Sequence, residues 1–420
     1  MRVIVIGAGL IGTATAFYLR QQNCQVTVFE RHAGAAMATS FANGGMLTPS
    51  QANPWNEPGI GMRLLRHLGD EHAPVLLRPA ALPGLLSWGC DFLRNASPGR
   101  YAANAAHNAE LASYSMATLH ELLSAVPLSY DRSTLGTLKI FPRGYDMAAV
   151  DAHSDLISGL GIRSVRLDPA GIVALEPGLG PIAGELAGGV HYPDDESGDA
   201  NRFTVALSET ARDAGVDFRF NCPVDALAVR NGHVTGVYCG TEHLAADAVV
   251  ACGGAWSRGL LRRVGVRLPL YPVKGYSLTL EPDDTAALPR LPLVDESRHI
   301  CLTPLGGRLR LAGTAEFNGF DAALPAARVE QLRTALRELL PAVAEQLLAE
   351  PGTAWCGFRP MTSDTVPVIG ATPVPGLYLN TGHGHLGWTF CAGSGRAVAD
   401  LVTGREPALN ILPYSLARFG

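Results

Sequence analysis

Charged residues are scarce in this sequence, and basic ones never gather into a run. They make up 17% of the 420 residues, and the formal net charge is −5 with a pI near 6.2. A nucleic-acid surface is therefore not expected. The sequence also lacks internal repeats, low-complexity segments, a basic region ahead of the first apolar run, and charge-free runs of membrane-spanning length. Hydrophobic residues make up 47% of the whole chain, which predicts a globular, cytoplasmic protein with two sizeable cores.

Cysteine occurs eight times, but never in a C-x-x-C pair or at metal-ligand spacing. Several cysteines lie within apolar, strand-like runs such as VVACGG, so we expect buried free thiols in a reducing compartment. The residues are Cys24, Cys90, Cys222, Cys239, Cys252, Cys301, Cys356 and Cys391.

One acidic cluster raises the question of a bound cation. It consists of Asp194, Asp195, Glu196 and Asp199. These residues lack the alternating ligand pattern that ends in a glutamate, so loop solvation and capping of the following helix are favoured. We expect no metal site.

The beginning of the chain carries the pattern that organises the rest. RVIVIG predicts a buried parallel strand, and GAGLIG places Gly7, Gly9 and Gly12 in a G-x-G-x-x-G spacing. One glycine permits the tight turn, one lets backbone approach a pyrophosphate, and one lets the helix lie close to the sheet. The free N–H groups at the helix start favour an anion. QVTVFE then predicts a strand ending in Glu30, which would bind a ribose diol; Arg31 is either a ribose or phosphate contact or a surface residue.

Small residues return in TSFANGGM, where backbone can pack closely on a flat ligand. Ser40 can cap a helix or donate to a phosphate, and Asn43 and Gly44 would follow on the far side of the ligand. An ordinary capped turn is the alternative. A strand near Val224 can lie against an adenine edge, and Gly254 follows the apolar strand VVAC at another close approach.

Apolar periodicity predicts helices over 101–123, 147–160, 204–215 and 327–340. Residues 263–350 alternate strand signals with the last of these helices and predict a mostly antiparallel second domain. LYLNTG predicts a strand that leads through a glycine loop into a helix with small residues on its packing face. Residues 53–98 alternate proline with apolar clusters; packed helices are favoured over a membrane-surface or quinone-facing patch.

Five motifs together carry a family resemblance: GAGLIG with Glu30, TSFANGG, YPVKGYSLTL, GFRPMTSDTVPVIG and NTGHGHLGWT. In this order and spacing the chain resembles the FAD-dependent D-amino-acid oxidase superfamily, most closely bacterial D-amino-acid dehydrogenases of the small-subunit type. The resemblance covers essentially the whole chain. It implies an α/β fold in which a Rossmann-like FAD-binding domain (1–83, 196–262 and 362–420) is interleaved with an α+β substrate domain (84–195 and 263–361) built on a mostly antiparallel sheet.

The resemblance also implies roles for individual residues. Those already named at the glycine segments would bind FAD. In GHGHLGWT, the residues at the pyrimidine edge of the isoalloxazine would be Gly384, Gly387, Trp388 and Thr389. A helix N-terminus at that edge would stabilise the negative charge of a reduced flavin.

Arg359 of GFRP resembles the arginine that binds the substrate carboxylate in this family. A guanidinium forms two parallel charge-assisted hydrogen bonds to a carboxylate, which fixes the hydrogen that the α-carbon presents. An interdomain salt bridge is the alternative. Tyr276 is a candidate second polar contact, with a core tyrosine as the alternative. We interpret His383 and His385 as loop-structural or flavin-adjacent, because hydride loss from a neutral amine needs no strong base.

The resemblance thus implies an FAD-dependent dehydrogenase of D-amino acids, with D-proline and 4-hydroxy-D-proline among the candidate substrates. Electrons would pass to a quinone or another carrier, which leaves a peripheral contact with the inner face of the membrane, or a subunit contact, open. The alternatives are a glycine- or sarcosine-type oxidase that makes hydrogen peroxide, and a flavin-holding subunit of a larger complex. Covalent flavin attachment, for which Cys356 lies near the relevant region, is a further open point.

Overall fold

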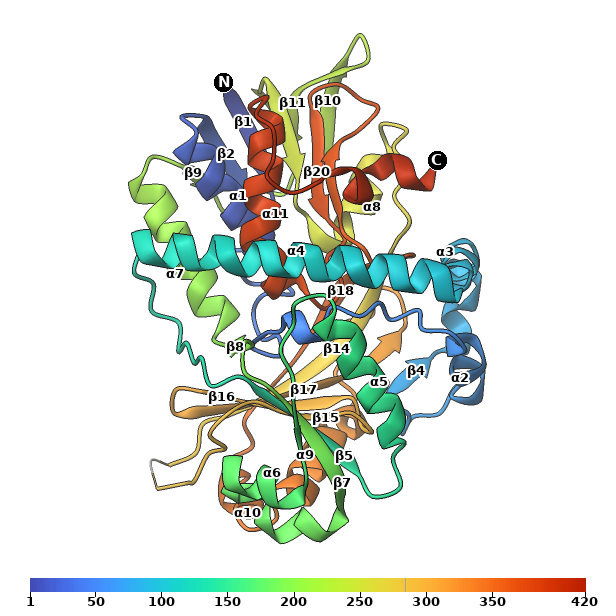
Figure 1. The fold of residues 1–420 in the computed structure, drawn as a ribbon. Coiled ribbons are helices and arrows are strands. Elements are labelled where there is room, and N and C mark those ends of the chain that lie inside the picture. The colour runs from blue at the N-terminus through green and yellow to red at the C-terminus, as the bar shows by residue number, and fades with distance from the viewer. Residues whose placement is uncertain (284) are drawn as a thin grey trace.

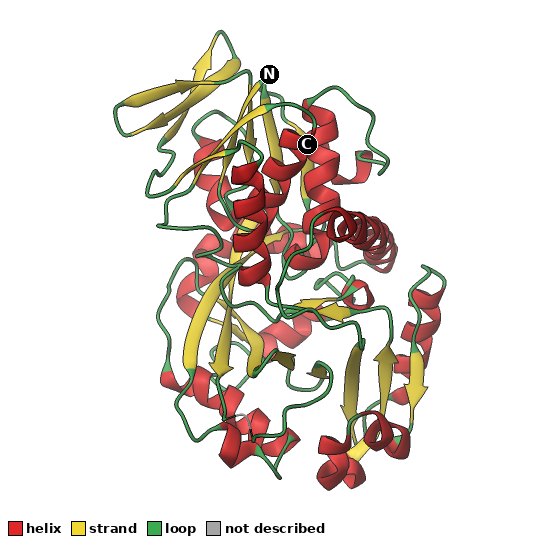
Figure 2. Cartoon of the chain, turned by 90° about the vertical axis from the view of Figure 1, so that its left-hand side faces the viewer, coloured by secondary structure: helices red, strands yellow, loops and turns green. Residues whose placement is uncertain are grey.

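The computed structural model describes residues 1–283 and 285–420, without the side chain of His153. Its strands form two large sheets toward opposite ends of the molecule, and the long helix α4 (Pro98–Ala125) lies across the middle (Figure 1). Figure 2, turned by 90°, shows helices covering both the upper and the lower strands. The predicted α/β fold with two sheets is confirmed.

The first sheet has six strands and is parallel except for one edge pair, β19 with β20. Its strands in spatial order are β19 (Val368–Ala371), β20 (Leu377–Thr381), β13 (Ala248–Ala251), β1 (Arg2–Ile6), β2 (Gln25–Phe29) and β9 (Asp217–Arg219). The apolar runs of β1 and β13 lie side by side at its centre and are almost wholly buried, as central parallel strands require. The strand, helix and strand expected at the beginning of the chain are present.

The second sheet has nine strands and is mostly antiparallel, as predicted. Its strands are β18 (Thr353–Thr362), β14 (Leu270–Leu280), β17 (Arg308–Phe317), β16 (Ile300–Leu305), β15 (Leu293–Asp295), β5 (Thr137–Pro142), β7 (Leu186–Tyr192), β6 (Val165–Leu167) and, paired with β17, β4 (Val75–Leu77). Since β4 belongs to this sheet, sheet membership favours a domain boundary before residue 75 instead of after residue 83. The division into five segments stays a prediction.

Two small sheets complete the strand inventory. They are the antiparallel set β10 (Ala226–Arg230), β11 (His233–Cys239) and β12 (Glu242–Ala245), and the pair β3 (Met46–Leu47) with β8 (Glu196–Ser197). The β10–β11 turn has positive φ at both Asn231 and Gly232, the conformation expected for an Asn-Gly hairpin turn.

The other helices are α1 (Leu10–Gln21), α2 (Ile60–Arg66), α3 (Leu82–Arg94), α5 (Met147–Ser158), α6 (Pro169–Leu175), α7 (Ala200–Asp213), α8 (Ser257–Arg262), α9 (Ala326–Leu339), α10 (Ala344–Leu347) and α11 (Gly387–Val402). They include those predicted from apolar periodicity, α5, α7 and α9, and also α6, α8 and α10, which the sequence did not predict. Short 3₁₀ turns lie at Pro49–Gln51, Pro79–Ala81, Pro177–Glu185, Gly254–Trp256, Leu412–Tyr414 and Leu416–Phe419. None of the helices in the described residues is both long and apolar enough to cross a membrane.

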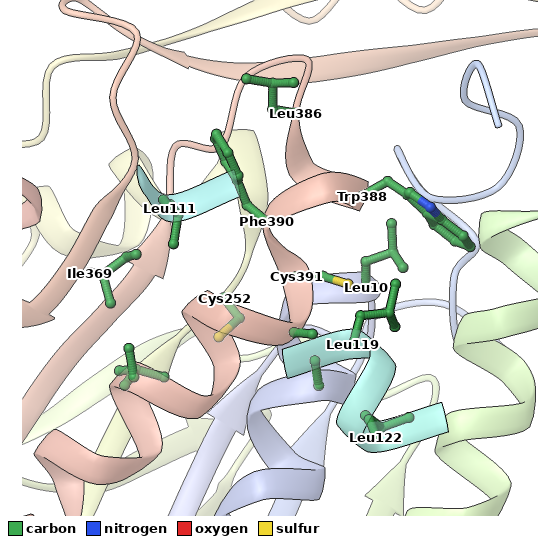
Figure 3. Close-up of a cluster of buried hydrophobic side chains, with 14 of the residues drawn as sticks. Leu10, Leu111, Leu119, Leu122, Cys252, Ile369, Leu386, Trp388, Phe390 and Cys391 are labelled. Carbon is green, nitrogen blue, oxygen red and sulfur yellow. The ribbon is translucent and has the colours of Figure 1, made fainter. Parts of the chain in front are cut away.

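Helix α11 packs against both α1 and α4 and joins them into one core. Figure 3 shows Trp388 and Phe390 of α11 among Leu10 of α1 and leucines of α4. The small residues predicted on the packing face of α11 permit this approach. A Cβ on Gly395 would lie 3.0 Å from the Ala14 backbone, and one on Gly393 would lie 2.7 Å from Ser115 Cα. The second core lies between the nine-stranded sheet and α9.

One of the two expectations for the acidic cluster needs correction. Asp199 caps α7, as predicted, by accepting hydrogen bonds from the backbone N–H groups of Asn201 and Arg202. Asp195 and Glu196, however, are buried instead of solvated. Asp195 accepts from Ser50 and Thr137, and burial raises the pKa of this carboxyl to about 6.

The prediction of free thiols is wrong for two cysteines. Cys222 and Cys239 form a disulfide across a Cα–Cα distance of 6.2 Å. The two residues are 17 positions apart, and the folding back of β10 and β11 brings them together, which no local pattern indicates. The other six are free thiols, of which Cys90 is exposed and Cys356 is partly buried.

Candidate active site

A cavity of about 920 Å³ is lined by residues of both large sheets. Its volume is at the upper end of the usual range for ligand sites. The predicted site residues that lie on its wall are Gly7, Gly9, Glu30, Arg31, Ser40, Asn43, Gly44, Val224, Gly254, Tyr276, Arg359, Gly384, Gly387 and Trp388. Segments far apart in the sequence therefore converge on one cavity.

The glycine turn after β1 forms one end of the cavity. Gly7 has a φ of +103°, which a residue with a side chain rarely adopts. Gly12 is not on the wall; a Cβ on it would lie only 1.8 Å from the Gly7 carbonyl oxygen, so it serves the close approach of helix and strand. Ser40 Oγ accepts a hydrogen bond from Leu10 N at 3.1 Å and thereby caps the start of α1.

Glu30 lies at the end of β2, beside that turn. Its carboxylate accepts from Ala8 N at 2.8 Å and from His32 N at 3.0 Å. A carboxylate offers about four acceptor positions, so two backbone donors leave it able to bind hydroxyl groups as well. Arg31 places its guanidinium 4.6 Å from the ring centroid of Trp256, which is also on the wall.

The nine-stranded sheet holds the segment around Asn43 and Gly44 in place. Arg310 donates to the Asn43 carbonyl at 3.0 Å, and Thr303 Oγ1 donates to the Gly44 carbonyl at 2.7 Å. Sequence reasoning missed both residues, because they lie on strands more than 250 positions away and no local pattern connects them to this segment.

The glycine loop before α11 closes another side of the cavity. Gly384, Gly387 and Trp388 lie on the wall, and α11 begins there. Thr389 does not lie on the wall; its buried hydroxyl accepts a hydrogen bond from Thr48 N at 3.0 Å. We therefore assign Thr389 to the support of the wall.

Three buried polar atoms, of α11 and of segments that adjoin it, belong to residues that line the cavity and have no hydrogen-bond partner in the part of the chain that the structure describes. They are Trp388 Nε1, His383 Nε2 and Asn380 Oδ1. A buried polar group without a partner is costly, so such groups at a cavity indicate a polar ligand.

Arg359 projects from β18 toward the same cavity. Its Nη1 donates to the Thr314 carbonyl at 2.9 Å, and the guanidinium carbon lies 5.4 Å from the Trp55 ring centroid. Within residues 1–283 and 285–420 it has no carboxylate partner, so the salt-bridge alternative finds no support there. Burial lowers the pKa of this guanidinium to about 10. A positive charge held in this way is suited to an anionic ligand.

Tyr276 is one of the lining residues, but its side chain extends into the second core. Its hydroxyl donates to Glu316 at 2.5 Å, and its ring packs in the core beneath α9. The alternation of β14 explains this, because Gly275 faces Arg359 and the next residue must face the opposite side. The structure thus gives the hydroxyl a partner other than a substrate. Cys356 shares that opposite face and is absent from the wall.

Both histidines of the glycine loop are neutral over the physiological pH range. Burial lowers the pKa of His383 to about 3 and that of His385 to about 4. The His385 ring stacks on Trp55, and its Nε2 lies 3.2 Å from the Gln51 carbonyl. These environments agree with the interpretation of both residues as structural or cofactor-adjacent.

The low pKa of His383 predicts a pH-dependent stability. The unfolded chain binds a proton near the ordinary pKa of 6.5 and the folded chain does not, so acidification favours unfolding. His383 alone should lower the free energy of unfolding by roughly 2 kcal/mol between about pH 7 and about pH 5. Urea unfolding at a series of pH values measures this slope. The slope should be shallower in His383→Gln. It should be unchanged in the control His72→Gln, because the His72 side chain is 91% exposed. Equal slopes in the wild type and both variants would contradict the prediction.

Comparison with known proteins identifies the family. The family model described as "FAD dependent oxidoreductase" matches residues 2–401. The chain belongs to this family. Two curated relatives, each named D-amino acid dehydrogenase, are similar over the full 420 residues and 99% of their own length: one from Paramagnetospirillum magneticum at 41% identity and one from Xanthobacter autotrophicus at 40%.

Solved structures support the fold of this FAD-dependent oxidoreductase. Glycine oxidase from Geobacillus kaustophilus superposes with a TM-score of 0.78 at 24% identity, covering 99% of both chains. L-proline dehydrogenase from P. horikoshii gives the same TM-score at 17% identity, covering 100% of this chain and 97% of the other. At these identities the likeness establishes the fold alone.

The cavity wall of the oxidoreductase fits FAD. The glycine turn and the free N–H groups of α1 suit a pyrophosphate, and Glu30 can accept from a ribose. The unpartnered atoms of Asn380, His383 and Trp388 lie on the wall that α11 helps to form, where a polar ring system would meet them.

Proposed function

We propose that this FAD-dependent oxidoreductase is a D-amino-acid dehydrogenase. It removes a hydride from the α-carbon of a D-amino acid, D-proline and 4-hydroxy-D-proline being among the candidates, and the imino product is hydrolysed or released. Two relatives of about 40% identity are named D-amino acid dehydrogenase, and this name is the support for the D configuration and for the dehydrogenase activity.

The observation that carries the proposal is the Arg359 guanidinium. It lies on the cavity wall, is oriented by a backbone carbonyl, and has no carboxylate partner among the described residues. Nε and Nη2 make no hydrogen bond there, which leaves donors for the carboxylate of an amino acid. The stack of Trp55 with His385 confines the space beside the guanidinium.

FAD, once bound, would supply the two-electron acceptor for this oxidation. Arg359 would fix the carboxylate and so decide which substituent of the α-carbon faces the cofactor. The neutral histidines would leave the protonation state of the amine to solution, and the reaction then needs no strong general base in the wall.

Anaerobic titration of the flavin-loaded protein tests the function. The panel consists of D- and L-amino acids, glycine, sarcosine and both prolines, and the flavin absorbance is recorded. Reduction by D-amino acids or a D-proline, followed by slow reoxidation in air and fast reoxidation by a quinone analogue, is expected. Reduction by glycine or sarcosine with fast reoxidation in air would instead establish the oxidase alternative. A stable, flavin-loaded chain that no member of the panel reduces would favour the flavin-holding subunit.

We further propose that the electrons pass to a quinone or another carrier, and that the protein works in the cytoplasm at the inner face of the membrane. The support is a group of exposed large apolar side chains on α2, just after it and on α3, namely Met62, Leu65, Leu68, Leu82, Leu86 and Leu93. The two helices are neighbours, since a Cβ on Gly61 would lie 3.0 Å from Leu93. Inner-facing residues of the same helices, such as Ile60 and Phe92, line the cavity.

Replacing two leucines of this group by glutamate should weaken binding to lipid. Leu65 and Leu86 are 65% and 67% exposed, so the double variant L65E/L86E should fold normally. Its affinity for phosphatidylethanolamine–phosphatidylglycerol vesicles should fall at least about tenfold in co-sedimentation, because two leucine side chains no longer enter the lipid. Leu412→Glu, at a leucine that is 75% exposed elsewhere, is the matched control. Equal sedimentation of all three proteins would count against the membrane contact.

A further inference from the structure

A β-bulge in the nine-stranded sheet lies directly behind Arg359. Lys274 of β14 pairs with Glu316 of β17, whereas Tyr276 pairs with Gly313, so β17 holds one extra residue between the two pairs. The residues concerned are Thr314 and Ala315, opposite Gly275. Bulges of this kind change the direction in which a side chain or a carbonyl points, and they are frequent beside active sites.

Thr314 adopts an unusual backbone conformation in this bulge. Its φ is +54°, which is strained for a β-branched residue and unstrained for glycine. The conformation directs its carbonyl to Arg359 Nη1, at 2.9 Å, while its N–H donates to the His299 carbonyl at 3.2 Å. Gly275 leaves room for this arrangement, because a Cβ there would lie 2.4 Å from Arg359 Nη1.

The backbone of Thr314 therefore accounts for the orientation of Arg359. It does not account for the presence of a threonine side chain at this position. Glycine could adopt the same φ and present the same carbonyl. What threonine adds is a hydroxyl group, and this hydroxyl is buried without a hydrogen-bond partner in the described structure. Thr314 is 5% exposed and lies on the cavity wall. A buried hydroxyl without a partner is unfavourable, so a ligand in the cavity is the natural source of one.

We propose that the Thr314 hydroxyl donates a hydrogen bond to the substrate carboxylate that Arg359 binds. The inference rests on the D-amino-acid dehydrogenase function proposed above and adds a second donor to its carboxylate site. The carbonyl and the hydroxyl belong to the same residue, so the group that orients the guanidinium also places this donor beside it. A carboxylate accepts several hydrogen bonds, and one arginine does not use all of its acceptor positions. A neutral hydroxyl donor can therefore bind at a remaining position.

The test compares the flavin-loaded wild type with Thr314→Val, Thr314→Ser and Thr314→Gly. Benzoate is the carboxylate probe and benzamide its uncharged control, with binding followed by the change in flavin absorbance. Thr314→Val and Thr314→Gly should each raise the Kd of benzoate and the KM for the D-amino acid about tenfold or more, as expected for losing a hydrogen bond to a charged group. The kcat and the affinity for benzamide should change much less. Thr314→Ser retains the hydroxyl and should stay within about threefold of wild type.

Thr314→Gly keeps the test decisive should the valine variant not fold, because glycine relieves the strained φ. Wild-type benzoate affinity in both the valine and glycine variants would overturn the proposal. So would a serine variant as impaired as valine, since that pattern indicates a packing role. A rise in KM for the amino acid with unchanged benzoate binding would assign the hydroxyl to the amine instead and overturn the carboxylate contact. Benzoate binding is independent of turnover, so a wild type that binds benzoate but is not reduced by D-amino acids would refute the proposed function and leave this inference standing.

Discussion

Replacing Arg359 by alanine is expected to lower kcat/KM for the D-amino acid by roughly 30- to 1000-fold, a loss of about 2 to 4 kcal/mol of transition-state binding. Among the described residues, this guanidinium is the only positively charged group at the proposed carboxylate position whose N–H donors are not all used within the protein. Its loss removes the two charge-assisted hydrogen bonds proposed for the carboxylate and the positive charge beside it. Steady-state kinetics with an artificial electron acceptor measure the effect, and the flavin content of the variant should match that of the wild type.

Two further arginine variants separate binding from stability. Arg359→Lys keeps the charge but loses the planar fork, so its kcat/KM should lie between those of the wild type and the alanine variant. Arg258→Ala is the matched control, because Arg258 donates to the Leu270 carbonyl of the same sheet and is absent from the cavity wall. It should leave kcat/KM unchanged. Wild-type kinetics in Arg359→Ala with a carboxylate substrate would end the assignment of this residue.

The features that sequence predicted well depend on short-range spacing. RVIVIG, the glycine pattern and QVTVFE fix a strand, a tight turn, a helix and a second strand within thirty residues, and each of these elements is present. Apolar periodicity likewise predicted a helix at 327–340, and α9 spans Ala326–Leu339. The family resemblance pointed to Arg359 and the glycine loop through compact motifs, and both lie on the cavity wall.

The features that sequence did not predict depend on how distant strands align. Tyr276 is two positions from Lys274 and one from Gly275, and only the register with β17 and β18 decides which of them faces the cavity. The same holds for the extra residue at Thr314, since a bulge is a property of two strands. Arg310 reaches Asn43 across 267 positions, and the Cys222–Cys239 disulfide depends on the fold of a small sheet. No pattern within one segment contains this information.

Replacing Gly12 by alanine is expected to abolish flavin binding, with bound FAD below about a tenth of the wild-type content. A Cβ at this position would lie 1.8 Å from the Gly7 carbonyl oxygen and 3.3 Å from Cys252 Cβ. Neither the backbone of the glycine turn nor the buried Cys252, which follows β13, can move away at little cost, so α1 must move away from the sheet. Overpacking of this kind costs about 1 to 3 kcal/mol or more. The N–H groups of α1 would then leave the position that suits a pyrophosphate. The ratio of flavin absorbance to protein absorbance, together with the melting temperature, measures both effects.

Two other glycine variants show whether packing or ligand approach is responsible. Gly89→Ala is the matched control, because Gly89 lies within α3 with nothing within 4 Å of a Cβ. It should keep its flavin and gain up to about 1 kcal/mol from the higher helix propensity of alanine. Gly9→Ala meets only Ser40 Oγ, at 3.3 Å, so its fold should be nearly undisturbed while a methyl group enters the space at the cavity wall. Loss of flavin from Gly9→Ala at an unchanged melting temperature would show that FAD itself needs the close approach of backbone. Full flavin content in both Gly9→Ala and Gly12→Ala would mean that the cofactor does not bind at this turn.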